Sequence, residues 1–347
     1  MKKCMAFMSC VLLLFGACKN NGDDDNATTT TTTAVEATTT TTMVSTTTTI
    51  EDHIGLFYND FEPATGPGEP PPGAQGTGPW ATRIMLATSS DGLTFTRTQD
   101  VVCDQAGVPN LIVDHDGYLR IYFIAWQESG NPQGNDANFL AFAIHNPDDR
   151  QWYFHKVVLD KTYQPGAVDP SVVLLDDKTY RLYFMADIGN FDLKIFSATS
   201  KDGRSFTVDT GARLDPDGGV FDPMVLKTGD SWLLIAGPDG SFAATSSDGL
   251  TFSTPSAFEV DGKRFHAWAG TALPRGGYRL YGYFTNARDT ITTVSSSDGT
   301  VWHADGITCL THEGADPELE KGFTTDVGVT LLPDGTFLMA YLALIPE

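Results

Sequence analysis

Two short phrases alternate along the chain between residues 90 and 341, and this repetition constrains the fold more than any other feature of the sequence. The first phrase is an Asp-Gly turn followed by an aromatic residue, found at Ser90–Phe95, Lys201–Phe206, Ser247–Phe252 and Ser297–Trp302, with a looser copy at Asp148–Trp152. The second is a strand, a tight turn and a Tyr-rich strand, found at Pro109–Phe123, Asp169–Phe184, Asp222–Ile235, Ala267–Tyr283 and Asp326–Tyr341. Five interleaved copies of each predict five blades of four strands.

The physical roles of the two phrases also predict how the blades assemble. In the turn phrase Asp caps the turn, Gly takes a positive φ angle and the aromatic residue packs into the core. The chain starts with a turn phrase at Asp91 and ends with the strand pair 326–341, so one blade should combine both ends of the domain and leave no open edge. Since no segment has sustained helical periodicity, we predict an all-β domain: a five-bladed β-propeller of four-stranded antiparallel blades, closed by N- and C-terminal strands in one blade. The strand-like segment Ile54–Tyr58 has no clear place in it.

The first 50 residues of the sequence have a different composition. Residues 1–17 have a short basic start and an apolar run that ends in Gly-Ala, which predicts a signal peptide, and Cys18 follows at the position where a bacterial lipoprotein is acylated. Ordinary secretion with an incidental Cys18 is the alternative. Residues 18–50 are a Thr-rich linker that we expect to be disordered, and residues 51–347 form the propeller. We therefore expect an exported protein, lipid-anchored to the bacterial cell envelope and facing the periplasm or the exterior.

The charge of the chain limits its partners. The net charge of −22 becomes −24 when residues 1–17, which hold two lysines and no acidic residue, are removed. Nucleic acid is therefore excluded as an expected partner, because phosphate binding needs a basic face. The acidity either serves solubility or lines a channel for a cation, so a structural calcium ion in the central channel is conceivable, whereas no residue spacing predicts a zinc site. We expect a monomer.

The strand phrases carry a resemblance to a known family. The Asp-Pro starts at Asp169-Pro170 and Asp222-Pro223 resemble those of five-bladed glycoside hydrolases of families 43, 32 and 68, and the turns resemble the Asp boxes of sialidases. The resemblance implies three axial carboxylates: an Asp base or nucleophile, an Asp that tunes, and a Glu acid. Asp169 fits the tuning position, but Asn110 stands where the base belongs and Asp222 lies where the Glu is expected. The candidate substitutes for the missing base are Asp104, Glu128, Asp326 or an acid within 313–320.

Several residues at equivalent places of the strand phrases are candidates for one axial site. Five-fold geometry would bring the carboxylates of Asp169, Asp222 and Asp326 towards the same opening, although each could instead cap its strand. His266 and Trp268 fall at the corresponding place of the fourth blade, where Trp268 would suit stacking against a sugar, and packing between blades is the alternative. The aspartates of the turn phrases should lie far from the axis and stabilise the fold.

Two cysteines remain for pairing within the predicted propeller. Cys103 and Cys309 occupy matching points of neighbouring blades, each after a fourth strand, so a disulfide between them is one possibility. Two cysteines do not require one, and free thiols are the alternative.

These observations leave two functional hypotheses open. The first is a surface-anchored glycoside hydrolase acting on an extracellular carbohydrate, in which Asp169 positions, Asp222 is the acid candidate, and Asp326 or Glu128 replaces the base. The second is a non-catalytic carbohydrate- or protein-binding propeller that has lost the catalytic trio. Asn110 favours the second hypothesis, because an amide cannot accept a proton as a base does.

Overall fold

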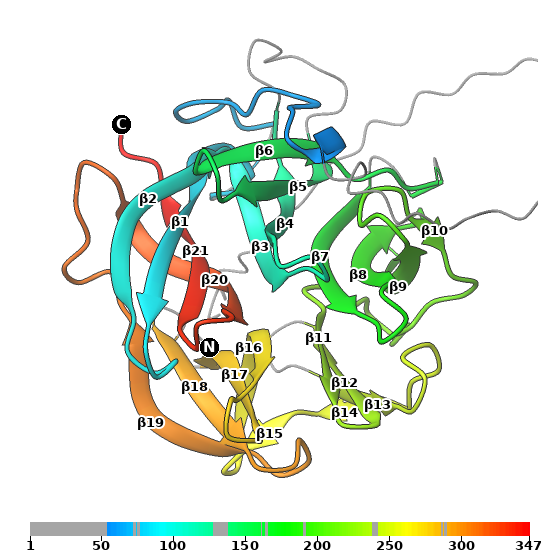
Figure 1. The fold of residues 1–347 in the computed structure, drawn as a ribbon. Helices are drawn as coiled ribbons and strands as arrows, with labels where there is room; N and C mark the ends of the chain where they lie inside the picture. The colour runs from blue at the N-terminus through cyan, green and yellow to red at the C-terminus, as the bar shows by residue number, and fades with distance from the viewer. Residues whose placement is uncertain are drawn as a thin grey trace, which may run out of the picture.

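A computed structural model describes residues 54–71, 74, 77–127, 138–160, 162–163, 166–189, 192–237, 242–285, 287 and 290–347. These residues form a five-bladed β-propeller, which confirms the predicted fold class (Figure 1). The signal peptide, Cys18, the Thr-rich linker and Glu128 lie outside the described residues, so the predictions made for them stay predictions. None of the helices in the described part of the chain is long and apolar enough to cross a membrane.

Each blade is an antiparallel sheet whose first strand lies nearest the centre of the ring (Figure 1). Blade I contains β3 (Ala106–Val113), β4 (Leu119–Ala125), β5 (Phe139–Asn146) and β6 (Gln151–Lys156). Blade II contains β7 (Ala167–Leu174), β8 (Tyr180–Asp187), β9 (Leu193–Ser200) and β10 (Thr207–Val208). Blade III contains β11 (Met224–Thr228), β12 (Ser231–Ala236), β13 (Phe242–Ser246) and β14 (Ser256–Ala257). Blade IV contains β16 (Lys263–Ala272), β17 (Tyr278–Phe284), β18 (Ile291–Ser296) and β19 (His303–Leu310), with the short β15 (Glu259–Val260) paired to β16.

Blade V joins the two ends of the domain, as predicted. Its strands from the centre outwards are β20 (Lys321–Leu331), β21 (Phe337–Leu344), β1 (Thr82–Ser89) and β2 (Thr96–Asp104). The β1–β21 pairing runs without a break from Thr82↔Leu344 to Ser89↔Phe337. Each of the inner strands β3, β7, β11, β16 and β20 contacts the inner strands of its two neighbours, so the ring is closed.

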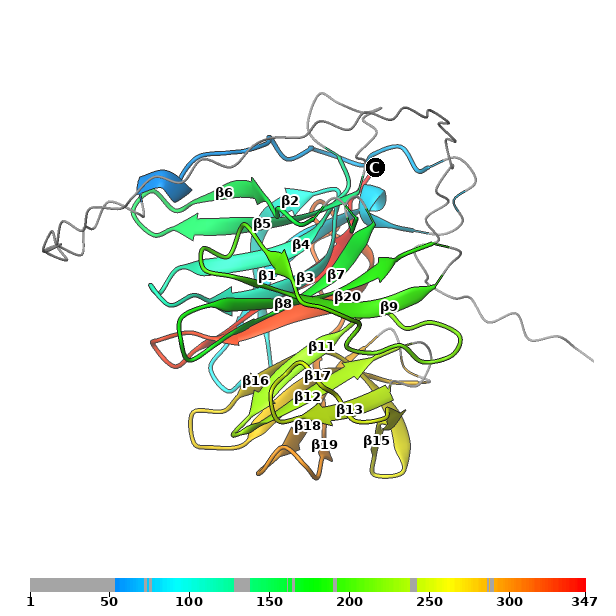
Figure 2. The same cartoon turned by 90° about the vertical axis from the view of Figure 1, so that its right-hand side faces the viewer.

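The segment Ile54–Tyr58 is not a blade strand. It contains a 3-10 helix at Ile54–Leu56 and begins a stretch that crosses the outer edge of blade I beside β6 (Figures 1 and 2). The Leu56 carbonyl oxygen lies 2.8 Å from Nε2 of the buried His155, and the Asp60 amide donates to the Phe154 carbonyl at 2.8 Å. This edge is covered rather than extended by another strand, which also protects its backbone groups from pairing with other chains.

A recurring contact joins neighbouring blades through the Asp-Gly turns. In three blades an Arg-x-Tyr sequence on the second strand reaches the turn of the next blade. The tyrosine hydroxyls donate to glycine carbonyls, from Tyr122 to Gly203 at 2.7 Å, from Tyr183 to Gly249 at 2.7 Å, and from Tyr281 to Gly92 at 2.9 Å. The matching arginines Arg120, Arg181 and Arg279 donate to the carbonyl oxygens of Asp202, Asp248 and Asp91. The turns therefore connect blades as well as strands.

Gly203 shows why these turns need glycine. Its φ angle is +72°, and an added Cβ would lie 2.7 Å from the Tyr122 hydroxyl oxygen. A larger residue would therefore meet both backbone strain and the interblade contact.

Cys103 and Cys309 are both free thiols, so the disulfide considered from the sequence is not formed. Both side chains are buried, but in different clusters. Cys103 packs with Ile84 and Phe123, whereas Cys309 packs with Met85 and Tyr281. Ile84 and Met85 are consecutive residues of β1, whose side chains point to opposite faces of the sheet, so blade V separates the two thiols.

Candidate functional site

The inner strands of three blades, and the residues just before the inner strand of a fourth, share an irregularity at the place that the sequence singled out. Non-glycine residues there have positive φ angles: Val108 (46°), Asp169 (56°), Asp222 (51°) and Asp326 (39°). In β3, β7 and β20 the pairing with the second strand shifts at this residue, as in a β-bulge. Such backbone conformations cost free energy, and they cluster at functional sites.

The structure brings Asp169, Asp222 and Asp326 together, although they come from three blades. The charges of Asp222 and Asp326 both act on Asp169, and the charge of Asp222 acts on Asp326. Blade V borders blades IV and I, so Asp326 reaches the opening from the side opposite blades II and III. The three aspartates therefore lie close enough for their charges to interact.

Asp169 and Asp222 form a tight pair. The Asp222 amide donates to Oδ2 of Asp169 at 3.4 Å, and the two side chains are hydrogen bonded to one another. Burial raises the pKa of Asp169 well above its ordinary value, and the neighbouring carboxylate of Asp222 raises it further. Only 6% of Asp169 is exposed, so its surroundings favour the protonated carboxyl over the carboxylate.

Asp326 is the third carboxyl of the axial cluster, and it is partly buried. Burial, followed by the charge of Asp222, raises its pKa to about 7. A large fraction of this carboxyl is therefore protonated at neutral pH. A carboxyl group in that state can donate a proton to a ligand oxygen.

Blade IV contributes aromatic rings to the same opening. The ring centroids of His266 and Tyr283 lie 5.0 Å apart and those of Trp268 and Tyr283 lie 4.9 Å apart. Burial lowers the pKa of His266 to about 4, so its imidazole is neutral at pH 7. The pKa of Tyr283 is raised by burial and then by the carboxylates of Asp222 and Asp326, which places this tyrosine beside the acidic cluster.

Tyr283 was missed as a site residue in the sequence. The available signal was its pairing partner: Tyr283 lies directly across from His266 in the β16–β17 register. That register depends on the bulge between Ala267 and Ala269, which the sequence pattern alone does not reveal.

Asn110 does not occupy the position of the missing base. Its Oδ1 accepts a hydrogen bond from the Val172 amide at 2.9 Å, just as Oγ of Ser171 accepts one from the Val225 amide at 3.0 Å. Asn110 is thus equivalent to Ser171 and connects neighbouring inner strands. The residue equivalent to Asp169 is Val108, so blade I contributes no carboxyl group at this level.

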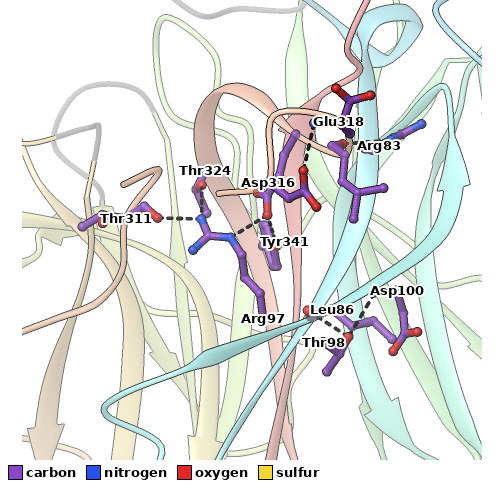
Figure 3. Close-up of polar contacts among 12 residues, drawn as sticks. Arg83, Leu86, Arg97, Thr98, Asp100, Thr311, Asp316, Glu318, Thr324 and Tyr341 are labelled. Atoms are coloured by element: carbon purple, nitrogen blue, oxygen red, sulfur yellow. Dashed lines mark hydrogen bonds and ion pairs between the residues drawn. The ribbon is translucent and has the colours of Figure 1, made fainter. Parts of the chain in front are cut away.

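Two of the other acidic substitutes, Asp104 and Glu320, are engaged elsewhere. Asp104 forms an ion pair with Arg83 at 2.8 Å. Glu320 is buried and pairs with Arg97, which also donates to the Thr311 carbonyl and to Thr324 Oγ1 (Figure 3). Both acids therefore hold blade V together.

The turn aspartates lie at the outer ends of the blades, as predicted. Oδ1 of Asp248 accepts hydrogen bonds from the amides of Leu250 and Thr251 at 2.8 and 2.7 Å, and these bonds lower its pKa. The same arrangement recurs at Asp91, Asp202 and Asp298. Their carboxylates are satisfied by the amides of their own turns.

The described residues contain no group of three or more His, Cys, Asp or Glu side chains arranged to hold a metal ion. The three axial aspartates are not such a group.

Comparison with known proteins identifies the fold. No protein-family model matches the chain, and no curated protein matches its sequence. Among solved structures, an N-acetylgalactosamine deacetylase from F. plautii in complex with blood group B trisaccharide has a TM-score of 0.51 at 13% identity, covering 73% of this chain and 82% of that one. An α-L-arabinofuranosidase from Clostridium thermocellum has a TM-score of 0.51 at 17% identity, covering 67% and 80%.

A third structure belongs to family 43 of the glycoside hydrolases. This β-xylosidase/α-arabinofuranosidase from a compost microbial metagenome, in complex with xylotriose, has a TM-score of 0.50 at 18% identity, covering 68% of this chain and 84% of that one. At these identities the similarity concerns the fold. The chain is a five-bladed β-propeller that resembles glycoside hydrolase propellers acting on carbohydrates.

Proposed function

We propose that this propeller is a glycoside hydrolase acting on an extracellular glycan at the axial opening between Asp326 and the Asp169–Asp222 pair. The observation that carries the proposal is the separation of roles among the three carboxyls. Asp326 has a pKa of about 7 and can hold a proton, whereas the hydrogen-bonded pair carries the shared negative charge. Glycoside hydrolysis needs these two kinds of carboxyl group.

The geometry also favours a division of labour that differs from the one expected from sequence. Acid and base carboxyls of glycosidases lie about 5–9.5 Å apart, so that the sugar or water fits between them. Asp169 and Asp222 are hydrogen bonded and too close for this purpose. We therefore assign Asp326 as the general acid, Asp222 as the carboxylate that supports attack at the sugar carbon, and Asp169 as the residue that tunes Asp222.

The aromatic residues of blade IV suit a sugar ring. Trp268 is partly exposed and packs against Tyr283, so one face of its ring system is held in place. Stacking of a pyranose face on such a ring would position the glycosidic oxygen beside the carboxyls. The neutral His266 would contribute a hydrogen bond rather than a charge.

The predicted export and lipidation at Cys18 suggest where this activity would take place. An acylated Cys18 followed by the Thr-rich linker would hold the propeller at the cell envelope, within reach of extracellular polysaccharide. Mass spectrometry of the membrane fraction should detect the acylated Cys18 peptide, and a mature N-terminus at any other residue would contradict the anchor.

The direct test is hydrolysis of a panel of aryl glycosides and polysaccharides by the purified full-length chain. We expect sugar release that falls by about 100-fold or more in Asp326→Asn, because general acid catalysis typically contributes factors of that size. Asp298→Asn is the matched control, since it makes the same chemical change in an outer turn. Release from no substrate by a folded protein would contradict the hydrolase.

Val108 supports a second candidate function, a non-catalytic glycan-binding propeller. It stands where the first blade of the family is expected to supply a carboxylate, and it packs instead against the hydrophobic core between blades I and II. A folded chain that binds glycans on an array but hydrolyses none of them would favour this alternative.

A further inference from the structure

A cavity lies between blades II and III, and the axial aspartates are not among its lining residues. It has a volume of about 530 Å³, and its walls include Asp209, Thr210, Arg213, Thr251 and Phe252. The first three residues follow the outer strand β10, and the last two precede the outer strand β14. The cavity is therefore on the outer wall of the propeller, whereas the axial carboxyls belong to the inner strands.

Arg213 is the charged centre of this cavity, and it is held firmly. Its Nη1 donates to the Leu250 carbonyl at 2.7 Å, and its Nη2 donates to the carbonyls of Thr210 and Gly211 at 2.5 and 2.6 Å. Only 8% of the residue is exposed, and Nε has no acceptor among the described residues. A guanidinium has five N–H donors, so these three bonds leave donors without a protein acceptor.

The charge of Arg213 also lacks a direct counterion. Of the three interblade arginines, Arg120 pairs with Asp114 at 2.7 Å and Arg279 with Asp305 at 3.6 Å, whereas Arg181 has no ion pair among the described residues. In the part of the chain that the structure describes, no carboxylate forms an ion pair with Arg213. Asp209 lines the same cavity, but its oxygens accept the hydroxyls of Ser197 and Thr199 at 2.6 and 3.2 Å.

The remaining cavity residues suit a sugar ring that carries a negative charge. Phe252 is partly exposed, unlike the aromatic residues at the same place of other turns, such as Phe95 and Phe206, which are buried. An exposed aromatic surface favours contact with the C–H face of a sugar, and the threonine hydroxyls at 210 and 251 can bond ring hydroxyls. A carboxylate is the group whose geometry best matches a guanidinium.

We propose that this cavity is a secondary binding site for an acidic saccharide unit, a uronate, whose carboxylate pairs with Arg213 while its ring lies against Phe252. The site would let the propeller bind a charged polysaccharide at a second place. It is independent of the axial carboxyls, so its test is a binding measurement and does not require hydrolysis.

The test compares methyl glucuronoside with methyl glucoside, which differ by the carboxylate, in NMR titrations of the isotope-labelled full-length chain. We expect saturable shifts of amides in the segments 209–213 and 250–252, with affinity for the glucuronoside higher by about tenfold or more. Added salt should weaken this preference because it screens the charge.

Thr251→Trp should abolish the shifts, since the indole fills the cavity from an exposed position. Thr94→Trp is the matched control: Thr94 is exposed, holds the same place in the turn of blade V, and has its amide bonded to Asp91 as that of Thr251 is bonded to Asp248. Binding that persists in Thr251→Trp, equal affinity for both sugars, or no saturable shift in these segments would each overturn the proposal. Loss of axial hydrolysis with intact glucuronoside binding would count against the proposed enzyme alone.

Discussion

The propeller contains two sets of repeated aspartates, and the same side chain behaves in opposite ways in the two sets. In the outer turns each carboxylate accepts hydrogen bonds from backbone amides, and its pKa is lowered, as at Asp298, where the value falls to about 2. At the axial ends of the inner strands, burial and neighbouring carboxylates raise the pKa values, to about 7 at Asp326. Repetition alone therefore does not distinguish a structural aspartate from a candidate catalytic one.

The difference arises from what surrounds each carboxylate. A turn aspartate is exposed and finds its partners within three residues along the chain, so its charge is stabilised locally. An axial aspartate is shielded from water and lies near other acidic side chains that come from distant parts of the sequence. The ring geometry thus concentrates unfavourable charge at one place, where it can be used for binding or catalysis.

Exchanging aspartate for asparagine in both sets gives the largest expected contrast. Asp222→Asn should lower kcat by about 100-fold or more, because the carboxylate that supports attack at the sugar is lost. Asp248→Asn should leave kcat within about twofold, since its carboxyl lies in an outer turn, where surface changes have small effects. Initial rates on the best substrate of the panel would measure both, and comparable losses in the two variants would contradict the assignment.

The raised pKa of Asp326 predicts a distinctive pH dependence of stability. Its carboxyl has a pKa of about 7 in the folded protein against 3.8 for the ordinary group, so the folded state binds the proton more tightly. Protonation of Asp326 therefore stabilises the folded state. This contribution to the free energy of unfolding is complete below about pH 4 and is lost as the pH rises through 7. Asp326→Asn removes this titration, so its free energy of unfolding should exceed that of the wild type at pH 8 by on the order of 1–3 kcal/mol.

Urea unfolding at several pH values would measure this difference. Asp298→Asn serves as the control, because a turn aspartate should not give a gain at pH 8. A variant that is less stable than the wild type at pH 8 would show that the Asp326 carboxylate is not destabilised by its surroundings.

The interblade contacts predict a smaller effect that concerns stability alone. Tyr183→Phe removes the buried hydrogen bond to the Gly249 carbonyl and should lower the free energy of unfolding by about 1–2 kcal/mol. Tyr153→Phe removes an exposed hydrogen bond to Asp149 and should change it by less than about 0.5 kcal/mol. Equal losses in chemical denaturation would mean that the interblade bond contributes no more than a surface contact.

The smallest expected effect lies in the outer turns at acidic pH. The amide of Thr300 is the main cause of the lowered pKa of Asp298, so this carboxylate stabilises the fold above about pH 4 and loses its effect as the pH falls to about 2. Asp298→Asn cannot titrate, so the gap between its unfolding midpoint and that of the wild type should shrink on acidification. Thermal unfolding between these pH values would detect the trend, and a constant gap would contradict it.

Much of the architecture could be predicted because its signals are local. Each Asp-Gly turn can be recognised from four to six consecutive residues. The alternation of these turns with strand pairs predicts both the number of blades and the blade V that the two ends of the domain share. The segment Ile54–Tyr58 could not be placed, since its role depends on Phe154 and His155 about a hundred residues away. Pairing of Cys103 with Cys309 was equally undecidable, because it depends on which face of blade V each thiol occupies.

The candidate site was predicted in part. Asp169, Asp222 and Asp326 were recognised from their equivalent places in the repeats, and the structure brings them together. Asn110 was misplaced by two residues, because the bulges at Val108 and Asp169 shift the register in a way that composition does not reveal. The only signal for Tyr283 was its pairing with His266, and the cavity beside Arg213 had no signal in the sequence.

The sequence by itself determined the fold class, the blade count and the mode of ring closure, since each depends on turn residues and strand periods that act over short distances. Only the tertiary structure decided which aspartates meet at the axis, which carboxyls have raised pKa values, and which arginine lines the outer cavity. Those properties depend on burial and on charges brought together from different blades, and the linear order of residues does not contain the distances that set them.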